Sequence, residues 1–174
     1  AALLIFSLFN SSDMFLLLKA KSSGLDDRYI IGIYIFYNLI YALSSYPLGI
    51  LADKIGLKKI IITGFFLFSM VYFGFAFANN LSEFGLLFIL YGLYAAATEG
   101  ISKAWISKLI AHNETATAIG TFTGLQSITL LLSSSITGFI WYQFNAATAF
   151  ITTGVVTLFV IVFIYYHCKE PIPK

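Results

Sequence analysis

The chain has 174 residues, of which 59% are hydrophobic, 18% are aromatic and only 10% are charged, with a formal net charge of +2. Soluble domains carry roughly 25% charged residues, so this composition excludes an ordinary soluble globule and predicts a protein that lies in a lipid bilayer. The single cysteine and two histidines exclude an internal disulfide and a cysteine-rich metal centre, and we expect no metal and no cofactor.

Six apolar segments follow one another along the chain, each close to the roughly 20 residues that a membrane-spanning helix needs. We predict them at residues 1–18, 29–52, 60–78, 84–110, 115–141 and 148–166. The fifth and sixth are separated at YQFNAA (142–147), where polar and aromatic residues gather as they do at membrane interfaces. The segments are apolar on all sides, whereas barrel strands alternate. The predicted fold class is an all-α membrane protein with six transmembrane helices.

The chain also contains a weak internal repeat. A shift by about half its length superposes Ser44 on Ser133, Gly49 on Gly138 and Asn10 on Glu99. Three helices per copy is an odd number, so the two copies would have opposite orientations in the membrane, as in many transporters. We predict repeat one at about 1–80 and repeat two at about 84–170, with chance similarity as the alternative.

The densest group of charges is LADKIGLKK (51–59), between the second and third predicted helices. We predict a short cytoplasmic hairpin. Gly49 lets its helix approach a neighbour closely, and Asp53 can accept hydrogen bonds from the N-terminus of a neighbouring helix. Gly56 allows the left-handed turn that ends a helix, while Lys58 and Lys59 lie at the membrane interface.

The distribution of basic residues predicts the orientation, because cytoplasmic loops carry an excess of Lys and Arg. One side collects Lys54, Lys58, Lys59, Lys108, Lys169 and Lys174. The other side collects Lys19, Lys21 and Arg28, partly offset by Asp26 and Asp27. We therefore expect an integral protein of the bacterial inner membrane with both ends of this segment in the cytoplasm.

The hairpin and its flanks resemble a known family. GILADKIGLKK (49–59) is similar to the loop motif of the major facilitator superfamily, G-x-x-x-D-[RK]-x-G-[RK]-[RK], with Leu57 where a basic residue often stands. The matching residues are Gly49, Asp53, Lys54, Gly56, Lys58 and Lys59. FNSSDMFLLLKA (9–20) resembles the seventh helix of bacterial members, and the stretches 98–110 and 115–127 resemble the tenth and eleventh. The resemblance implies the C-terminal half of such a transporter, with an N-terminal six-helix half as its missing partner.

Ionisable groups inside the bilayer are costly and are therefore candidates for function. Glu99 lies near the middle of the fourth segment, and Lys103 follows one turn later on the same face. Asn10 and Asp13 lie in the first segment. The family resemblance implies that these two helices line a central cavity. We hypothesise that Glu99 exchanges protons or binds a cationic substrate group while Lys103 adjusts its protonation; the alternative is a pair that only neutralises itself.

The remaining polar candidates have two interpretations each. Asp13 either faces the transport path or marks a helix irregularity near the outer face. Gln126 is predicted to form a helix–helix hydrogen bond, with a substrate contact as the alternative. A polar stripe, Tyr34, Asn38, Tyr41 and Ser45, indicates helix packing or a cavity wall. Two small-residue stripes, Gly92–Ala96–Gly100 and Gly120–Gly124, predict close helix contacts.

The preferred function is one half of a secondary active transporter that moves a small organic molecule by alternating access, as a proton-coupled exporter. Its expected partners are the substrate, protons, the N-terminal half and the lipid bilayer. The alternatives are a homodimeric six-helix transporter and a scaffold without transport activity. An enzyme is not expected, because no Gly-x-Ser-x-Gly or His-Glu-x-x-His motif is present. Nucleic acid is excluded by the lack of a basic stripe, and ATP is not indicated because there is no phosphate-binding loop.

Overall fold

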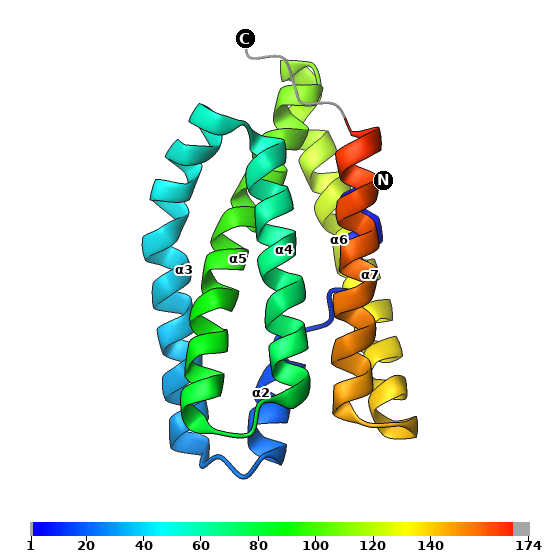
Figure 1. Ribbon diagram of the computed structural model, residues 1–174. Helices are drawn as coiled ribbons and strands as arrows, with labels where there is room; N and C mark the ends of the chain where they lie inside the picture. Colours follow the sequence, from blue (N-terminus) through cyan, green and yellow to red (C-terminus); the bar gives the residue numbers. More distant parts are fainter. Residues whose placement is uncertain (1, 169–174) are drawn as a thin grey trace.

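The computed structural model describes residues 2–168 and is built from α-helices (Figure 1). The elements are α1 (Ala2–Ser7), α2 (Met14–Ser22), α3 (Asp27–Ile55), α4 (Leu57–Phe77), α5 (Leu81–Leu109), the short 3₁₀ turn η1 (His112–Glu114), α6 (Thr115–Gln143) and α7 (Ala146–His167). No strand occurs within the described residues. Helices α3 to α7 are each long and apolar enough to cross a membrane, which confirms an all-α membrane architecture.

The five later predicted segments begin and end within three residues of α3 to α7. The first prediction is wrong as a single helix, because α1 ends at Ser7 and α2 begins only at Met14. The intervening stretch contains Asn10, Ser11, Ser12 and Asp13. Short polar side chains of this kind compete for backbone hydrogen bonds and disfavour a helix interior. The structure therefore has five continuous spanning helices and one interrupted segment, where the sequence predicted six continuous ones.

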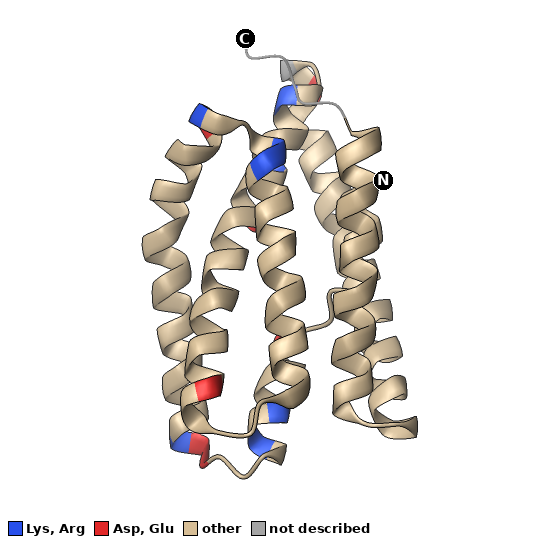
Figure 2. Cartoon of the chain, in the orientation of Figure 1, with Lys and Arg blue, Asp and Glu red and all other residues tan. Residues whose placement is uncertain are grey.

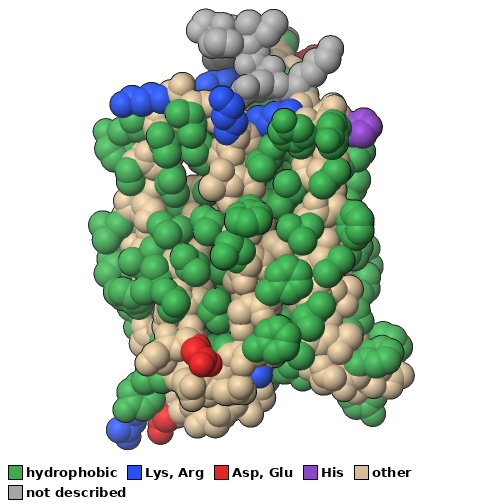
Figure 3. Space-filling view, in the orientation of Figure 1, with side chains coloured by type: hydrophobic (Ala, Val, Ile, Leu, Met, Phe, Trp, Pro, Cys, Tyr) green, Lys and Arg blue, Asp and Glu red, His purple; other side chains and the backbone are tan. Residues whose placement is uncertain are grey.

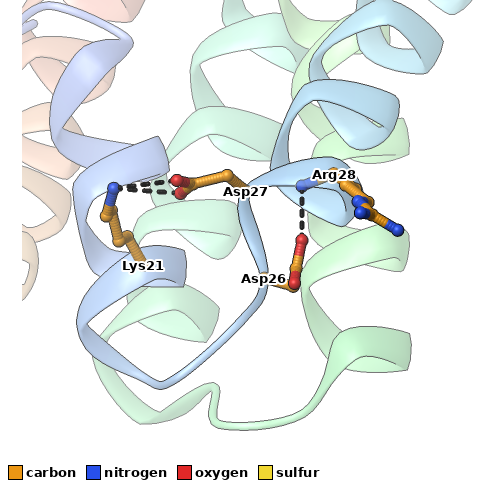
Figure 4. A network of polar contacts seen from close by, with 4 residues as sticks. All are labelled: Lys21, Asp26, Asp27 and Arg28. Atoms are coloured by element: carbon orange, nitrogen blue, oxygen red, sulfur yellow. Dashed lines mark hydrogen bonds and ion pairs between the residues drawn. The ribbon is translucent and has the colours of Figure 1, made fainter.

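Local hydrogen bonds set the ends of α3. The side chain of Asp26 accepts a hydrogen bond from the main-chain amide of Arg28 at 2.9 Å, which caps the helix start (Figure 4). Beside it, Lys21 pairs with Asp27 at 2.9 Å, but both side chains are largely exposed, so this ion pair contributes less than about 1 kcal/mol. At the other end Gly56 has a φ of +106°, a value that favours glycine, and α4 starts directly after it. The predicted turn is confirmed.

The core lies around α4 and α5. Helix α5 packs along α3 and α4, and α4 packs in turn against α7, with α6 beside α7 (Figure 1). The largest fully buried side chains are mostly aromatic: Tyr72, Phe65, Phe68, Phe75, Phe84, Phe88 and Phe150. Gly92 permits a close approach of α5 to α3, since a Cβ there would lie 3.0 Å from the carbonyl oxygen of Tyr37. This part of the predicted small-residue stripe is confirmed.

Helices α3 and α6 are exposed along most of their length. A Cβ built at Gly49, Gly100, Gly120 or Gly124 would meet no atom of the described residues within 4 Å. The close contacts predicted at these glycines are therefore not formed inside this chain. Apolar side chains cover the visible face between the two ends (Figure 3), while Lys and Arg gather at the ends (Figure 2). This distribution is the one that a bilayer requires.

Candidate functional site

The interruption between α1 and α2, residues 8–13, lies about midway between the two ends of the bundle (Figure 1). Helix α1 packs against α6 and α7, whereas α2 packs against α3, so the interruption connects two groups of helices. Its backbone is held partly by side chains. The amide of Ser12 donates to the hydroxyl of Ser134 on α6 at 3.2 Å. Irregular backbone at membrane depth is tolerated where it is buried in protein or lines a cavity.

Asp13 ends the interruption and receives two tyrosine hydroxyls. Tyr91 of α5 donates to its Oδ1 at 2.6 Å, and Tyr37 of α3 donates to its Oδ2 at 3.2 Å. The carboxylate is half-buried. Hydrogen bonds to an ionised acceptor are stronger than neutral ones. Asp13 thus joins the start of α2 to both α3 and α5. It also stands at a helix irregularity, which was one of the two interpretations of Asp13 from the sequence.

Polar atoms next to Asp13 are only partly satisfied. The amide nitrogen of Asn10 donates to the Tyr94 hydroxyl at 3.2 Å, but its Oδ1 is buried without a partner among the described residues. Ser11 is only 1% exposed, and its hydroxyl lies beside the buried hydroxyl of Tyr72. A buried polar group without a partner costs about 1–3 kcal/mol. Such an atom indicates a place where a ligand or water would complete the hydrogen bonding.

Glu99 and Lys103 do not form the ion pair that their spacing allows. The carboxylate of Glu99 accepts a hydrogen bond from the Tyr41 hydroxyl of α3 at 2.9 Å. Within the described part of the chain, ion pairs join Lys21 to Asp27 and Lys108 to Asp53, and neither involves Glu99 or Lys103. Both side chains are exposed. The structure therefore gives no support to a self-neutralising pair.

Two adjoining cavities contain most of the predicted path residues. The first, here called the Lys103 cavity, has a volume of about 230 Å³, and the second, the Asp13 cavity, has a volume of about 390 Å³. Each is lined by the residue after which it is named. Four residues line both cavities: Ser7, Asn10, Glu99 and Gln126. The Asp13 cavity falls in the range of small-molecule sites, which runs from about 300 to 1,000 Å³, whereas the Lys103 cavity alone is smaller.

Two predicted residues differ from expectation. Asn38 lines neither cavity; it is exposed, and its amide donates to the carbonyl oxygen of Tyr34 on its own helix at 2.8 Å. The side chain of Gln126 forms no hydrogen bond to another helix among the described residues, although it lines both cavities. The residues of the polar stripe on α3 therefore have different surroundings. Tyr34 lines the Asp13 cavity and Tyr41 contacts Glu99, whereas Asn38 lines neither cavity.

Two side-chain hydrogen bonds join the hairpin 51–59 to other helices of the described part of the chain. Asp53 accepts from Lys108 of α5 at 3.2 Å, so in this chain its partner is a lysine and not a helix N-terminus. Lys58 donates to the carbonyl oxygen of Tyr165 near the end of α7 at 2.9 Å, and its ammonium lies 5.6 Å from the ring centroid. A cation near a helix C-terminus is stabilising. Lys54 and Lys59 are exposed.

Comparison with known proteins identifies the family. The family model described as Major Facilitator Superfamily matches residues 1–174. The chain belongs to the Major Facilitator Superfamily. It is 38% identical over 143 residues to an uncharacterized MFS-type transporter of Methanocaldococcus jannaschii, and this stretch is 79% of the chain and 36% of the relative. The chain therefore spans about a third of the length of the curated relative it matches.

Membership of the superfamily confirms the resemblance that the hairpin motif indicated. With five helices able to cross a bilayer, the protein is an integral, multi-pass membrane protein. The superfamily consists of transporters, which points away from an enzyme.

Sequence reasoning missed the tyrosines that contact Asp13 and Asn10 of this superfamily member. Tyr37 and Tyr91 hold Asp13, Tyr94 holds Asn10, and the rings of Tyr91 and Tyr94 pack with centroids 5.2 Å apart. A signal was present in the sequence, since Tyr91 and Tyr94 lie three residues apart in the middle of an apolar helix. Tyrosine is more common at membrane interfaces, so a mid-membrane pair is a marker of buried polar contacts.

Proposed function

We propose that the protein containing this chain is a secondary active transporter, and that residues 1–174 form its C-terminal six-helix half. It moves a small organic molecule across the membrane by alternating access. The observation that carries the proposal is the pair of cavities at the interruption, which bring Asn10, Asp13, Glu99 and Gln126 together. A midplane site at a discontinuous helix is typical of secondary transporters.

The exposed helices α3 and α6 are where the missing N-terminal half is expected to pack. Their open glycines would then make the close contacts that this chain alone does not make. The inverted repeat has support from the helix bounds. Shifting α3 by the 89 positions between Ser44 and Ser133 gives 116–144, and α6 occupies Thr115–Gln143. The same shift carries α4 to 146–166, and α7 occupies Ala146–His167.

The orientation we propose has the 51–59 hairpin in the cytoplasm. The bond between Lys108 and Asp53 brings Lys108 to the same end of the bundle as the lysines of the hairpin. The opposite end holds Lys19, Lys21 and Arg28, partly balanced by two aspartates. Two further lysines counted from the sequence, Lys169 and Lys174, lie outside the described residues. In a cytoplasmic (inner) membrane, which we propose as the location, the positive-inside rule then favours both ends of this segment inside the cell.

Proton coupling is proposed through the two carboxylates of the cavities. Asp13 is faced by Tyr37 and Tyr91, and Glu99 is faced by Tyr41, with Lys103 one turn away. Each carboxylate can bind a proton without breaking a salt bridge, because neither is ion-paired among the described residues. A proton entering from outside would exchange against substrate leaving the cell, which is export by antiport.

The test uses inside-out vesicles that contain the natural full-length protein. The vesicles are given an acidic interior by a pH jump and incubated with a defined metabolite mixture, and their contents are measured by mass spectrometry with and without a protonophore. At least one compound is expected to accumulate only with the protein, and to be lost with the protonophore. Glu99→Gln should abolish the protonophore-sensitive part, whereas the surface variant Glu83→Gln should not. No accumulation of any compound would contradict transport, and protonophore-insensitive accumulation would contradict proton coupling.

A further inference from the structure

The Asp13 cavity carries negative charge without a matching cation. Asp13 and Glu99 both line it, and its described lining contains no Lys, Arg or His. Lys103 lines only the neighbouring cavity. Among the described residues, the carboxylate of each receives only tyrosine hydroxyls, which leave its negative charge without a counterion. The charge of the site is therefore complementary to a cation.

Some hydrogen-bond donors of the same lining are used inside the protein. The hydroxyls of Ser7, Thr123 and Ser127 donate to carbonyl oxygens of their own helices at 2.9 to 3.1 Å. The amide nitrogen of Asn10 donates to a tyrosine. The donors that remain belong to neutral side chains, Ser11, Ser12, Tyr34 and Gln126, so nothing in this lining neutralises an anion.

Acceptors remain available as well. Each carboxylate has lone pairs beyond those that the tyrosines use. Asn10 Oδ1 is buried without a partner among the described residues, and Asn10 lines this cavity. This unsatisfied amide oxygen is independent of the acidic pair and points to the same chemistry, because it can only accept hydrogen bonds. A group with several N–H donors and a positive charge would satisfy the carboxylates and this oxygen together.

We infer that the substrate is an organic amine, whose ammonium or guanidinium group binds in the Asp13 cavity against Asp13 and Glu99. The inference rests on the proposed transport function and narrows its substrate class. The ring of Tyr34, which also lines the cavity, offers the apolar body of such a molecule a packing surface and its charge a cation–π contact. The cavity volume of about 390 Å³ fits a small molecule.

Four probes that share a phenylalkyl body separate charge from donor capacity. They are 2-phenylethylamine, its N,N,N-trimethyl derivative, the neutral 2-phenylethanol and the anionic 3-phenylpropanoate. Their affinities for the purified full-length protein in detergent are measured by calorimetric titration. The amine is expected to bind at least about tenfold more tightly than the alcohol and the trimethyl derivative, because it alone supplies charged donors. The propanoate is expected not to bind.

Variants locate the binding. Asp13→Asn and Glu99→Gln should each weaken amine binding about tenfold and leave the weak binding of the alcohol unchanged. The matched control is Asp27→Asn, because Asp27 is an exposed aspartate outside both cavities, paired with Lys21. It should bind the amine like the unmodified protein. An unchanged melting temperature shows that a variant is folded. Where the melting temperature falls, unchanged binding of the alcohol shows that the cavity is still formed.

Three results would overturn the inference: no saturable amine binding, propanoate binding as tight as the amine, or full amine affinity in both folded cavity variants. Equal affinity for the trimethyl derivative would overturn the role of N–H donors. These titrations measure binding and not transport, so the transport function and the substrate class can be contradicted independently. Amine binding in a protein that transports nothing contradicts the transport function alone. Transport of only neutral or anionic compounds, without amine binding, contradicts the substrate class alone.

Discussion

Replacing Gly92 by Ala is expected to push α3 away from α5. The added Cβ would lie 3.0 Å from the carbonyl oxygen of Tyr37 and equally close to a methyl group of Ile40. The carbonyl oxygen belongs to the helix backbone and cannot rotate away, so the helices must separate by a few tenths of an ångström. This contact matters for the site, because the same helix pair places the Tyr37 hydroxyl at Asp13.

Two opposing contributions decide how much Gly92→Ala changes the free energy of unfolding. Ala stabilises a helix interior by about 1 kcal/mol relative to Gly, whereas overpacking costs about 1–3 kcal/mol. Gly85→Ala on the same helix isolates the first contribution, since no atom lies within 4 Å of a Cβ at Gly85. We therefore expect Gly92→Ala to be about 1–3 kcal/mol less stable than Gly85→Ala. Each kcal/mol corresponds to roughly 2–4 °C in melting temperature for a chain of this size.

The assay is thermal unfolding of both full-length variants in the same detergent, followed by the loss of the monodisperse peak in size-exclusion chromatography. Gly85→Ala should melt at or slightly above the unmodified protein, and Gly92→Ala clearly below it. If Gly92→Ala melts at or above Gly85→Ala, the tight contact between α3 and α5 is refuted. The position of Tyr37 beside Asp13 would then need revision too, because it depends on that contact.

Three further predictions test the site and its setting. Tyr91→Phe should raise amine affinity more than Tyr37→Phe, because both hydroxyls compete with the amine for Asp13 and that of Tyr91 bonds at 2.6 Å, against 3.2 Å for Tyr37; titration of both variants measures this, and the reverse order would count against the geometry. Ser134→Ala should lower the melting temperature by removing the acceptor of the Ser12 amide, a loss of about 1–3 kcal/mol, whereas the adjacent Ser135→Ala, whose hydroxyl bonds only to its own helix, should change it little. The intact mass of the natural polypeptide should be roughly double the 19.3 kDa of this chain, and a mass near 19.3 kDa would favour a homodimer.

The five continuous helices could be predicted because a bilayer leaves few options. Backbone groups must be satisfied within the helix, and apolar runs bounded by charges give its length. The interruption at residues 8–13 was not predicted as a break, because a hydropathy average over a whole span conceals a short polar run. The information was in the order of the residues Asn10, Ser11, Ser12 and Asp13, which favours turns over helices.

The partners of the carboxylates could not be predicted from spacing within one helix. The i,i+4 rule places Lys103 beside Glu99, yet the bond of Glu99 goes to Tyr41 on another helix. Which residue of α3 meets Glu99 depends on the rotation and depth of α3 against α5. Those are set by Gly92 and its neighbours, through packing that a single sequence does not display. Residue type therefore identified the candidates, and tertiary packing decided their contacts.

The same contacts suggest how binding and helix movement are linked. Asp13 connects α2 to α3 and α5, and Glu99 connects α5 to α3, in each case through a tyrosine hydroxyl. A cation that binds both carboxylates competes with those hydroxyls for the same oxygens. Weakening a hydrogen bond of Asp13 would loosen α2 at the point where its helix is already interrupted, so little further backbone energy is needed for α2 to move. A ligand can shift such an equilibrium only by its differential affinity for the two arrangements, and competition for these oxygens supplies one source of that difference.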